Sequence, residues 1–315
     1  MKRVIITGPT GTIGMALIKK CIEKNIQVLA IVNPNSARKE QVLRHPQVKY
    51  MESDIKGYLS LKWEKQYDVW FHLAWCGASG NARNDMYLQN DNVKYLLDAV
   101  KAAKKAGCRT FVGAGSQAEY GASGSPLNGD SPTFPDTGYG MAKLCAGQMG
   151  RMLCKMNNIR FIWPRIFSVY GPYDGENTMI MTGIRKLLEG EVPSFTKGEQ
   201  EWDYLYCDDA AEILLRLAKK GISGKVYCVG SGETRRLSEY ITVMRDKVDL
   251  KAEIDLGGIP YGDNQLMYLC ADMRDVKADT EFDKFTSFEE GIGKTIDWYK
   301  EQRRNHGQEY NKEKN

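Results

Sequence analysis

The stretch RVIITGPTGTIG, residues 3–14, is a β-branched strand pattern that runs into three glycines spaced three apart, and an amphipathic helix pattern follows it. Gly8 permits a tight turn, Gly11 lets the backbone approach a pyrophosphate, and Gly14 lets the helix pack close to the strand. The N-terminus of such a helix offers free N–H groups and a partial positive charge to phosphates. The stretch therefore predicts a dinucleotide-binding turn.

Short apolar strands keep alternating with amphipathic helices through the first half of the chain. Because helical crossovers join parallel strands, this order predicts an α/β fold with a doubly wound parallel sheet of the Rossmann type. Strands are expected over residues 3–7, 27–32, 48–52, 68–74, 109–112 and 159–167, with helices over residues 15–24, 90–105 and 139–156 and after Ser36.

The alternation of strands and helices ends at about residue 168, and the loops and isolated helices that follow predict a smaller C-terminal substrate-binding lobe. The Rossmann domain is expected to comprise residues 1–167 plus about 204–220, and the lobe about 168–203 and 221–303. Within these, residues 208–219 and 287–299 read as helices and 226–229 as a strand. The polar residues 304–315 are expected to form a flexible tail.

Composition excludes several classes of function. The net charge of the 315 residues is only +4 and the two signs alternate, so neither nucleic acid nor a membrane surface is an expected partner. Eight scattered cysteines are typical of reduced thiols in a cytoplasmic protein. No metal is expected, because the three histidines lie far apart. The strand near Met1 leaves no room for a signal peptide, and no apolar run is long enough to span a membrane.

The second strand predicts which cofactor binds. NAD-preferring sites usually place an acidic residue after this strand, but here Asn33, Ser36 and Arg38 follow. These groups suit a 2′-phosphate, so NADP(H) is favoured over NAD(H); alternatively, Arg38 is an ordinary residue of a surface helix. The expected cofactor-binding residues are Gly8, Thr10, Gly11, Thr12, Ile13, Gly14, Asn33, Ser36, Arg38, Asp54, Ile55, Leu73, Ala74, Trp75, Tyr139 and Lys143.

Tyr139 and Lys143 stand four residues apart at the start of a predicted helix, so their side chains share a face. A phenol with a pKa of about 10 is a poor base at neutral pH, and a nearby ammonium favours the phenolate. Ser116 stands 23 residues before Tyr139, at the end of another predicted strand. We predict that these three residues are catalytic.

Together these motifs resemble the extended short-chain dehydrogenase/reductase family, specifically its nucleotide-sugar epimerases, dehydratases and ketoreductases. The resemblance implies that Tyr139 moves the substrate proton, Lys143 holds the nicotinamide ribose and Ser116 hydrogen-bonds the reacting oxygen. The hydride would move to or from C4 of the nicotinamide. The matching segments are the glycine motif and residues 72–74, 116–121, 139–143, 164–172 and 202–209.

Gln117 and Ala118 narrow the reaction that this resemblance implies. The 4,6-dehydratases of the family carry Asp and Glu at these two positions, and neither residue here can transfer a proton in their place. An NADPH-dependent 4-ketoreductase of a nucleoside-diphosphate 4-keto-6-deoxyhexose is therefore favoured. An NAD-dependent 4-epimerase of nucleoside-diphosphate sugars is the alternative. A reductase of a non-nucleotide carbonyl and a non-catalytic regulator remain further alternatives.

The substrate side departs from the family pattern. Ser168 stands where many relatives have Asn, and Trp202 stands where many have an Arg that binds the sugar diphosphate. The expected substrate-binding residues are Gln117, Ser168 and Trp202. Arg165 and Lys197 could contact a diphosphate in place of the family's arginines, or Arg165 could instead form an ion pair within the lobe junction. The small residues 113–115 are expected to leave room for the nicotinamide and a sugar ring. The resemblance also implies a homodimer formed through the helices over residues 90–105 and 139–156.

Overall fold

A parallel sheet carries the larger part of the molecule in the computed structural model, which describes residues 1–262 and 265–312. Seven strands run in the order β12-β7-β5-β4-β1-β2-β3, and the short β6 pairs with β7. Every pairing in this sheet is parallel. The strands are β1 (Arg3–Thr7), β2 (Gln27–Val32), β3 (Val48–Glu52), β4 (Val69–His72), β5 (Thr110–Gly113), β6 (Gly115–Ser116), β7 (Arg160–Ile166) and β12 (Val226–Val229).

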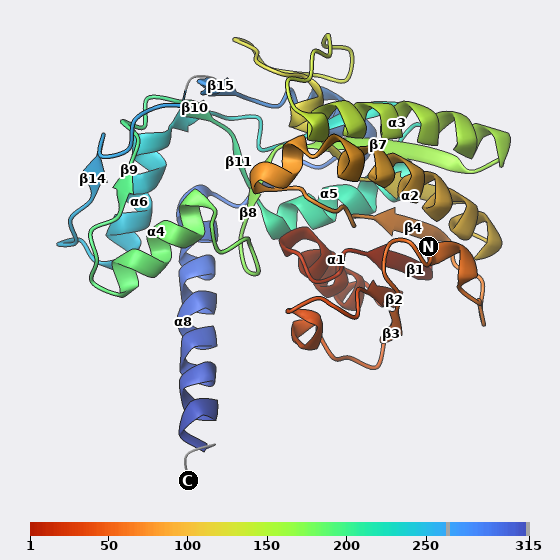
Figure 1. The fold of residues 1–315 in the computed structure, drawn as a ribbon, viewed down its shortest axis with the longest axis horizontal. Helices are drawn as coiled ribbons and strands as arrows, with labels where there is room; N and C mark the ends of the chain where they lie inside the picture. Colours follow the sequence, from red (N-terminus) through yellow and green to blue (C-terminus); the bar gives the residue numbers. More distant parts are fainter. Residues whose placement is uncertain (263–264, 313–315) are drawn as a thin grey trace.

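Helices cover both faces of this sheet (Figure 1), which confirms the doubly wound fold. Helices α1 (Thr12–Glu23) and α5 (Cys207–Lys220) pack together, as do α2 (Met86–Lys105) and α3 (Gly138–Met156). Strand side chains alternate between the two layers: Ile6 packs in the core beneath α1 and α5, and Ile5 in the core beneath α2 and α3.

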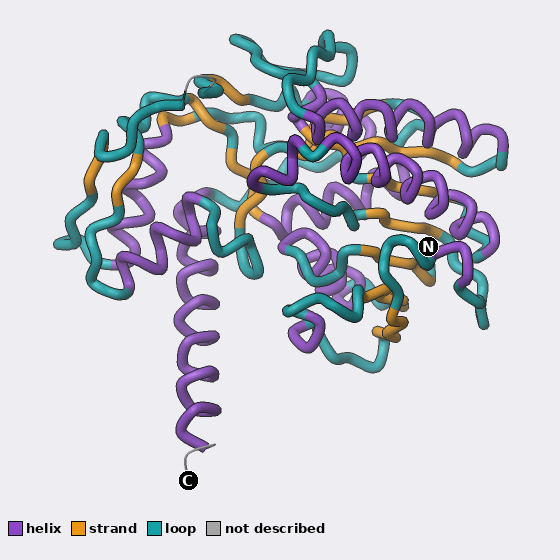
Figure 2. The backbone as a smooth tube through the Cα atoms, viewed as in Figure 1, coloured by secondary structure: helices purple, strands orange, loops and turns teal. Residues whose placement is uncertain are grey.

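The smaller lobe lies to one side of the sheet in Figures 1 and 2. It contains three short sheets, with strand orders β13-β10-β15, β11-β8 and β14-β9. Its elements are β8 (Ser168–Tyr170), α4 (Met179–Leu188), β9 (Ser194–Phe195), β10 (Glu201–Trp202), β11 (Tyr204–Tyr206), β13 (Arg235–Arg236), α6 (Leu237–Val248), β14 (Asp255–Leu256), β15 (Tyr268–Leu269), α7 (Arg274–Thr280) and α8 (Phe288–Lys312).

Three local features differ from the sequence expectations. The helix expected after Ser36 is one short 3-10 turn, η1 (Lys39–Gln41), because Ser36 closes a turn onto the Asn33 carbonyl before it. Strand β12 joins the large sheet beside β7, although its residues were assigned to the lobe. Helix α8 continues to Lys312, past the expected end at residue 299, and residues 313–315 of the expected tail lie outside the described residues.

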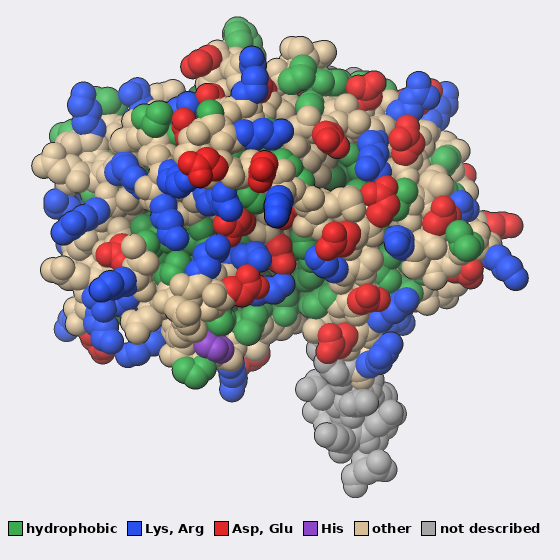
Figure 3. All heavy atoms as spheres, turned by 180° about the vertical axis from the view of Figure 1, so that it is seen from behind, with side chains coloured by type: hydrophobic (Ala, Val, Ile, Leu, Met, Phe, Trp, Pro, Cys, Tyr) green, Lys and Arg blue, Asp and Glu red, His purple; other side chains and the backbone are tan. Residues whose placement is uncertain are grey.

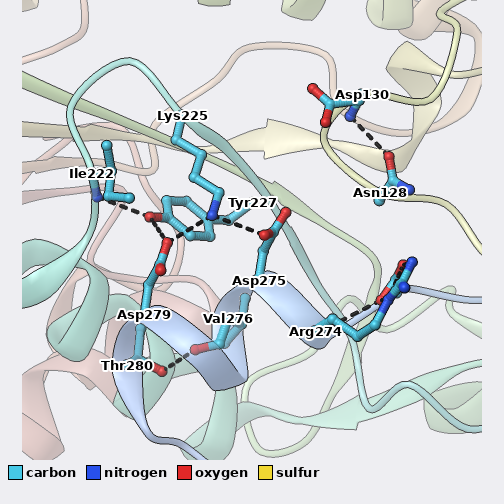
Figure 4. A network of polar contacts seen from close by, with 11 residues as sticks. Asn128, Asp130, Ile222, Lys225, Tyr227, Arg274, Asp275, Val276, Asp279 and Thr280 are labelled. Atoms are coloured by element: carbon cyan, nitrogen blue, oxygen red, sulfur yellow. Dashed lines mark hydrogen bonds and ion pairs between the residues drawn. The ribbon is translucent and has the colours of Figure 1, made fainter.

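A polar network joins α7 to the edge strand β12 (Figure 4). The Lys225 ammonium lies 2.8 Å from carboxylate oxygens of both Asp275 and Asp279. The Tyr227 hydroxyl donates to the same Asp279 oxygen over 2.6 Å. Since Lys225 and Tyr227 flank the start of β12, this network fixes a helix of the smaller lobe against the large sheet.

Charges of both signs are interspersed over the face shown in Figure 3. Within the part of the chain that the structure describes, no helix is both long and apolar enough to cross a membrane.

Candidate active site

Ser116, Tyr139 and Lys143 line one cavity of about 440 Å³ at the carboxyl edge of the sheet. Ser116 ends β6, and Tyr139 and Lys143 lie in the first turns of α3, which begins at a Thr137 cap whose hydroxyl accepts from Gly140 N. The glycine turn lines the same cavity through Gly8, Gly11, Thr12, Ile13 and Gly14. The structure thus brings the predicted catalytic residues together beside the predicted cofactor turn.

Ser116 is held by a capping box at the start of η4 (Gln117–Glu119). Its hydroxyl oxygen accepts from Ala118 N over 3.2 Å, and its own N–H donates to Glu119 Oε1 over 2.8 Å. The Ser116 side chain is therefore fixed from both ends of a single turn. Sequence analysis did not predict this role for Glu119.

Beneath Ser116, the Glu119 carboxylate also accepts from Trp163 Nε1 over 3.1 Å and from Arg165 Nε over 2.7 Å. Arg165 therefore forms the internal ion pair that was one of its two expected roles. A Cβ on Gly115 would lie 2.6 Å from Trp163 Nε1, so this glycine is also required by the packing under the site.

Lys143 is buried, and its ammonium lies nearer to the Trp75 ring than to the Tyr139 ring. Its ammonium donates to the Ala114 carbonyl over 2.8 Å and lies 3.7 Å from the Trp75 ring centroid, but 5.6 Å from that of Tyr139. Burial lowers the pKa of Lys143 to about 7, and the negative charge of Glu119 opposes that effect. Burial therefore makes Lys143 lose its proton more readily than an exposed lysine.

Tyr139 faces a second cation that sequence analysis missed. The Arg83 guanidinium carbon, in η3 (Gly80–Asn84), lies 4.4 Å from the Tyr139 ring centroid. Burial raises the pKa of Tyr139 above its usual value, while the Ser116 hydroxyl and the Arg83 charge act to lower it. His72 is not part of this group, because it is buried in the core against Thr7 and burial lowers its pKa to about 3.

A second cavity of about 350 Å³ adjoins the first at the glycine turn. Gly8 has φ +70° and its Cβ would lie 2.8 Å from Ala74 N, while a Cβ on Gly14 would collide with the Gly8 carbonyl oxygen. The backbone of this turn therefore requires Gly8 and Gly14, whereas a Cβ on Gly11 would meet only the Gly8 carbonyl oxygen at 3.8 Å. The space beside the turn fits a dinucleotide. The cavity is lined by Gly8, Pro9, Thr10, Gly11, Ile31, Asn33, Ser36, Ser53, Ile55, Tyr58, Leu73, Ala74, Trp75 and Cys76.

Two predicted cofactor residues lie outside the lining of both cavities. Asp54 accepts from the Lys56 backbone N–H over 3.0 Å. Arg38 donates to the carbonyl of Tyr173, in the loop after β8. The Arg38 guanidinium therefore ties the loop after β2 to the loop after β8.

Comparison with known proteins agrees with this architecture. Residues 4–230 match the family described as the NAD dependent epimerase/dehydratase family. The chain belongs to this family. It is thus an enzyme, and the resemblance seen in its motifs is confirmed.

Named members of the epimerase/dehydratase family are distant relatives. Protein CapI of Staphylococcus aureus is 23% identical over 95% of this chain and 98% of its own length. The dTDP-4-dehydro-6-deoxyglucose reductase of Escherichia coli is 25% identical over 80% of this chain and 83% of its own. Among solved structures, UDP-N-acetylglucosamine 4-epimerase from Methanobrevibacter ruminantium M1, in complex with UDP-N-acetylmuramic acid, shares the fold with a TM-score of 0.86. That match is 22% identical and covers 96% of this chain and 99% of the other.

The predicted substrate residues of this epimerase/dehydratase member lie outside the cavity lining, and two of them, Ser168 and Trp202, are in contact. Trp202 Nε1 donates to Ser168 Oγ over 2.8 Å, and Tyr240 holds the Trp202 carbonyl over 3.0 Å. Gln117 is half-buried beside Ser116. Asp174, which was not predicted, does line the cavity, where it accepts from Gly175 N and Thr178 Oγ1.

Proposed function

We propose that this protein is an NAD-dependent 4-epimerase of nucleoside-diphosphate sugars. The joint lining of one cavity by the glycine turn, Ser116, Tyr139 and Lys143 supports hydride-transfer chemistry. One observation favours epimerisation over reduction by exchangeable NADPH. The Arg38 guanidinium donates to the Tyr173 carbonyl. It does not line the second cavity, where the adenosine of a cofactor would lie, so it is not poised to receive a 2′-phosphate.

The chain's own residues would carry the proton side of the reaction. Tyr139 takes the proton of the sugar hydroxyl, and Ser116 donates a hydrogen bond to the same oxygen. Lys143 holds the cofactor ribose. Bound NAD supplies the acceptor and donor for the hydride. After the sugar carbonyl has formed, the sugar would present its opposite face within the same cavity, and Tyr139 would return the proton to the oxygen, so that the configuration would be inverted without net oxidation.

The similar proteins reported above bear the names of enzymes of the class proposed here. The solved structure described above is named as a 4-epimerase acting on a UDP-linked sugar. A second candidate is the NADPH-dependent 4-ketoreductase that the sequence favoured. It is supported by Asn33 and Ser36, which line the adenosine side where an acidic residue is usual for NAD, and by the similarity to the Escherichia coli reductase.

The experiment starts from purified protein whose bound nucleotide is identified by mass spectrometry. UDP-glucose, UDP-N-acetylglucosamine and UDP-glucuronic acid are incubated with the protein and NAD, and epimers are detected by proton NMR. We expect one of them to interconvert without net NADH formation, and Tyr139→Phe to abolish conversion. Retention of the C4 hydrogen in deuterium oxide would show that hydride returns directly from the cofactor.

The alternative outcomes are distinct. Oxidation of NADPH on 4-keto-6-deoxy sugar nucleotides without epimerisation would favour the ketoreductase. Failure of UDP, CDP, GDP and dTDP to bind in calorimetry would favour a non-nucleotide carbonyl substrate and would overturn both nucleotide-sugar proposals.

We also propose that the enzyme is a homodimer joined through α3. Five solvent-facing residues at helical spacing form a stripe on this helix, and the four methionines among them are 47% to 76% exposed. An apolar stripe of this length on a charged surface is typical of an interface. The α3 stripe consists of Met141, Cys145, Met149, Met152 and Met156.

A further inference from the structure

The short helix η3 is docked directly on the start of the catalytic helix α3. Asn84 Oδ1 accepts from Gly138 N over 3.0 Å, which satisfies one of the free N–H groups of the first turn. A Cβ on Gly138 would lie 3.1 Å from the Arg83 carbonyl oxygen and 2.7 Å from Met86 Sδ. The backbone of η3 therefore sits against the residue that precedes Tyr139.

This docking places the Arg83 guanidinium on the Tyr139 ring. Its central carbon lies 4.4 Å from the ring centroid, within the distance at which a cation interacts with an aromatic face. Nη1 of Arg83 donates to the carbonyl of Ala78, a residue that lines the catalytic cavity. The side chain is thus anchored at one nitrogen while its charge faces the phenol.

Lys143, the other cation near the phenol, lies nearer to the Trp75 ring than to the Tyr139 ring. Its ammonium lies 5.6 Å from the Tyr139 ring centroid and is occupied by the Ala114 carbonyl and the Trp75 ring. A guanidinium keeps its proton throughout the working pH range, whereas an amine can lose its proton when buried. Arg83 is therefore the more dependable positive charge beside the tyrosine.

We propose that Arg83 is a positioning residue for proton transfer, which acts through Tyr139 by stabilising its phenolate. The proposal deepens the function proposed above and rests on Tyr139 being the proton-transfer group there. Other groups also act on this phenol. Ser116 and Arg83 lower the pKa of Tyr139, and Glu119 and burial raise it. Glu119 is itself paired with Arg165, which offsets part of its charge.

The test reads the phenol directly and needs no substrate. The protein is labelled with ¹³C at the tyrosine ring carbon that bears the hydroxyl, saturated with NAD and titrated by NMR. The chain has 17 tyrosines, so Tyr139→Phe identifies the signal. We expect Arg83→Gln to raise the Tyr139 midpoint by about one pH unit, at the low end of the effect of a charge at ~4–6 Å. Arg83→Lys should restore most of the wild-type midpoint.

Asn84→Ala is the matched comparison, because it weakens the docking that places Arg83 but keeps the charge. Its Tyr139 midpoint should lie between those of the wild type and Arg83→Gln. An unchanged midpoint in Arg83→Gln would overturn the proposal, as would a larger shift in Asn84→Ala than in Arg83→Gln, which would assign the effect to the docking and not to the charge. Once a substrate is known, the acid limb of the kcat profile should move to higher pH in Arg83→Gln, with KM unchanged.

These readouts separate the two proposals. A Tyr139 shift in a protein that epimerises no sugar nucleotide would retain the role of Arg83 and remove the proposed substrate class. Epimerisation with no effect of Arg83→Gln on either the midpoint or the kcat profile would do the reverse.

Discussion

Nε of Arg165 lies 2.7 Å from Oε2 of Glu119, and neither side chain is more than 4% exposed. The same carboxylate accepts from the N–H of Ser116, so the ion pair supports the turn that carries the Ser116 hydroxyl. One Arg165 nitrogen, Nη1, is buried without a hydrogen-bond partner, so Glu119 is the partner on which this guanidinium depends. Removing one member of such a pair leaves an uncompensated buried charge.

Glu119→Gln is therefore expected to lower the free energy of unfolding by about 3–5 kcal/mol. Urea denaturation followed by circular dichroism measures this change. The double variant Glu119→Gln/Arg165→Met removes both charges and should recover a large part of the loss, because no charge is then left unpaired in the interior. A single variant as stable as the wild type, or a double variant less stable than the single, would contradict this account of the pair.

Lys143 should make stability depend on pH. Burial lowers its pKa to about 7 in the folded protein, whereas an unfolded lysine titrates near 10.4, so between these values the unfolded chain holds the additional proton. The free energy of unfolding contributed by this residue therefore rises with pH across that window. Below it the buried ammonium is destabilising.

Comparison of cofactor-free wild type with Lys143→Met measures this contribution by urea denaturation at several pH values. We expect the variant to be the more stable protein near neutral pH and its advantage to shrink as the pH rises towards the titration of unfolded lysine. A difference in unfolding free energy that does not vary with pH would show that Lys143 keeps an ordinary pKa in the fold.

The α3 stripe should control the oligomeric state. We expect Met149→Lys/Met152→Lys to convert a dimer to a monomer, because two like charges would face each other across an apolar contact. Size-exclusion chromatography with light scattering gives the mass. Leu250→Lys is the control, since Leu250 is 76% exposed in the smaller lobe. A wild-type protein that is already monomeric would refute the proposed interface.

The Lys225 network should protect the fold against acid. Hydrogen bonds from Lys225 and Tyr227 hold the pKa of Asp279 below its usual value. The stabilisation is therefore present above the pKa of an unfolded aspartate and is lost as the pH falls through the lowered folded value. Asp279→Asn should reduce the Tm at neutral pH, and the Tm difference from wild type should vanish in strong acid. A difference that persists at the lowest pH would assign the loss to packing.

Local patterns were enough to predict the frame of this molecule. The turn at Gly8, Gly11 and Gly14 was predicted from the spacing of these glycines. The shared face of Tyr139 and Lys143 was predicted from their four-residue spacing on one helix. These features depend on residues that are close together in the chain, so they could be predicted from the sequence alone. The helix expected after Ser36 is wrong because side-chain and turn bonds of Asn33 and Ser36 compete with helical ones.

The rest of the site depends on long-range contacts. Arg83 reaches Tyr139 only because η3 docks on α3, and Glu119 meets Arg165 across 46 positions of sequence. Asp174 enters the cavity from a loop that has no periodic pattern. Nothing in the local sequence distinguishes these charged residues from solvent-exposed ones, so their roles required the folded chain.

The contact between Arg38 and the Tyr173 carbonyl joins the loop after β2 to the loop after β8, and both loops contribute residues to the two cavities. The proposed epimerase would keep its NAD through each turnover, and a tie between these loops would slow the exchange of that cofactor. For an enzyme that returns its hydride within one turnover, such retention has a metabolic consequence. The balance between the two sugar epimers would be set by their own free energies and would be insulated from the redox state of the cellular nicotinamide pool.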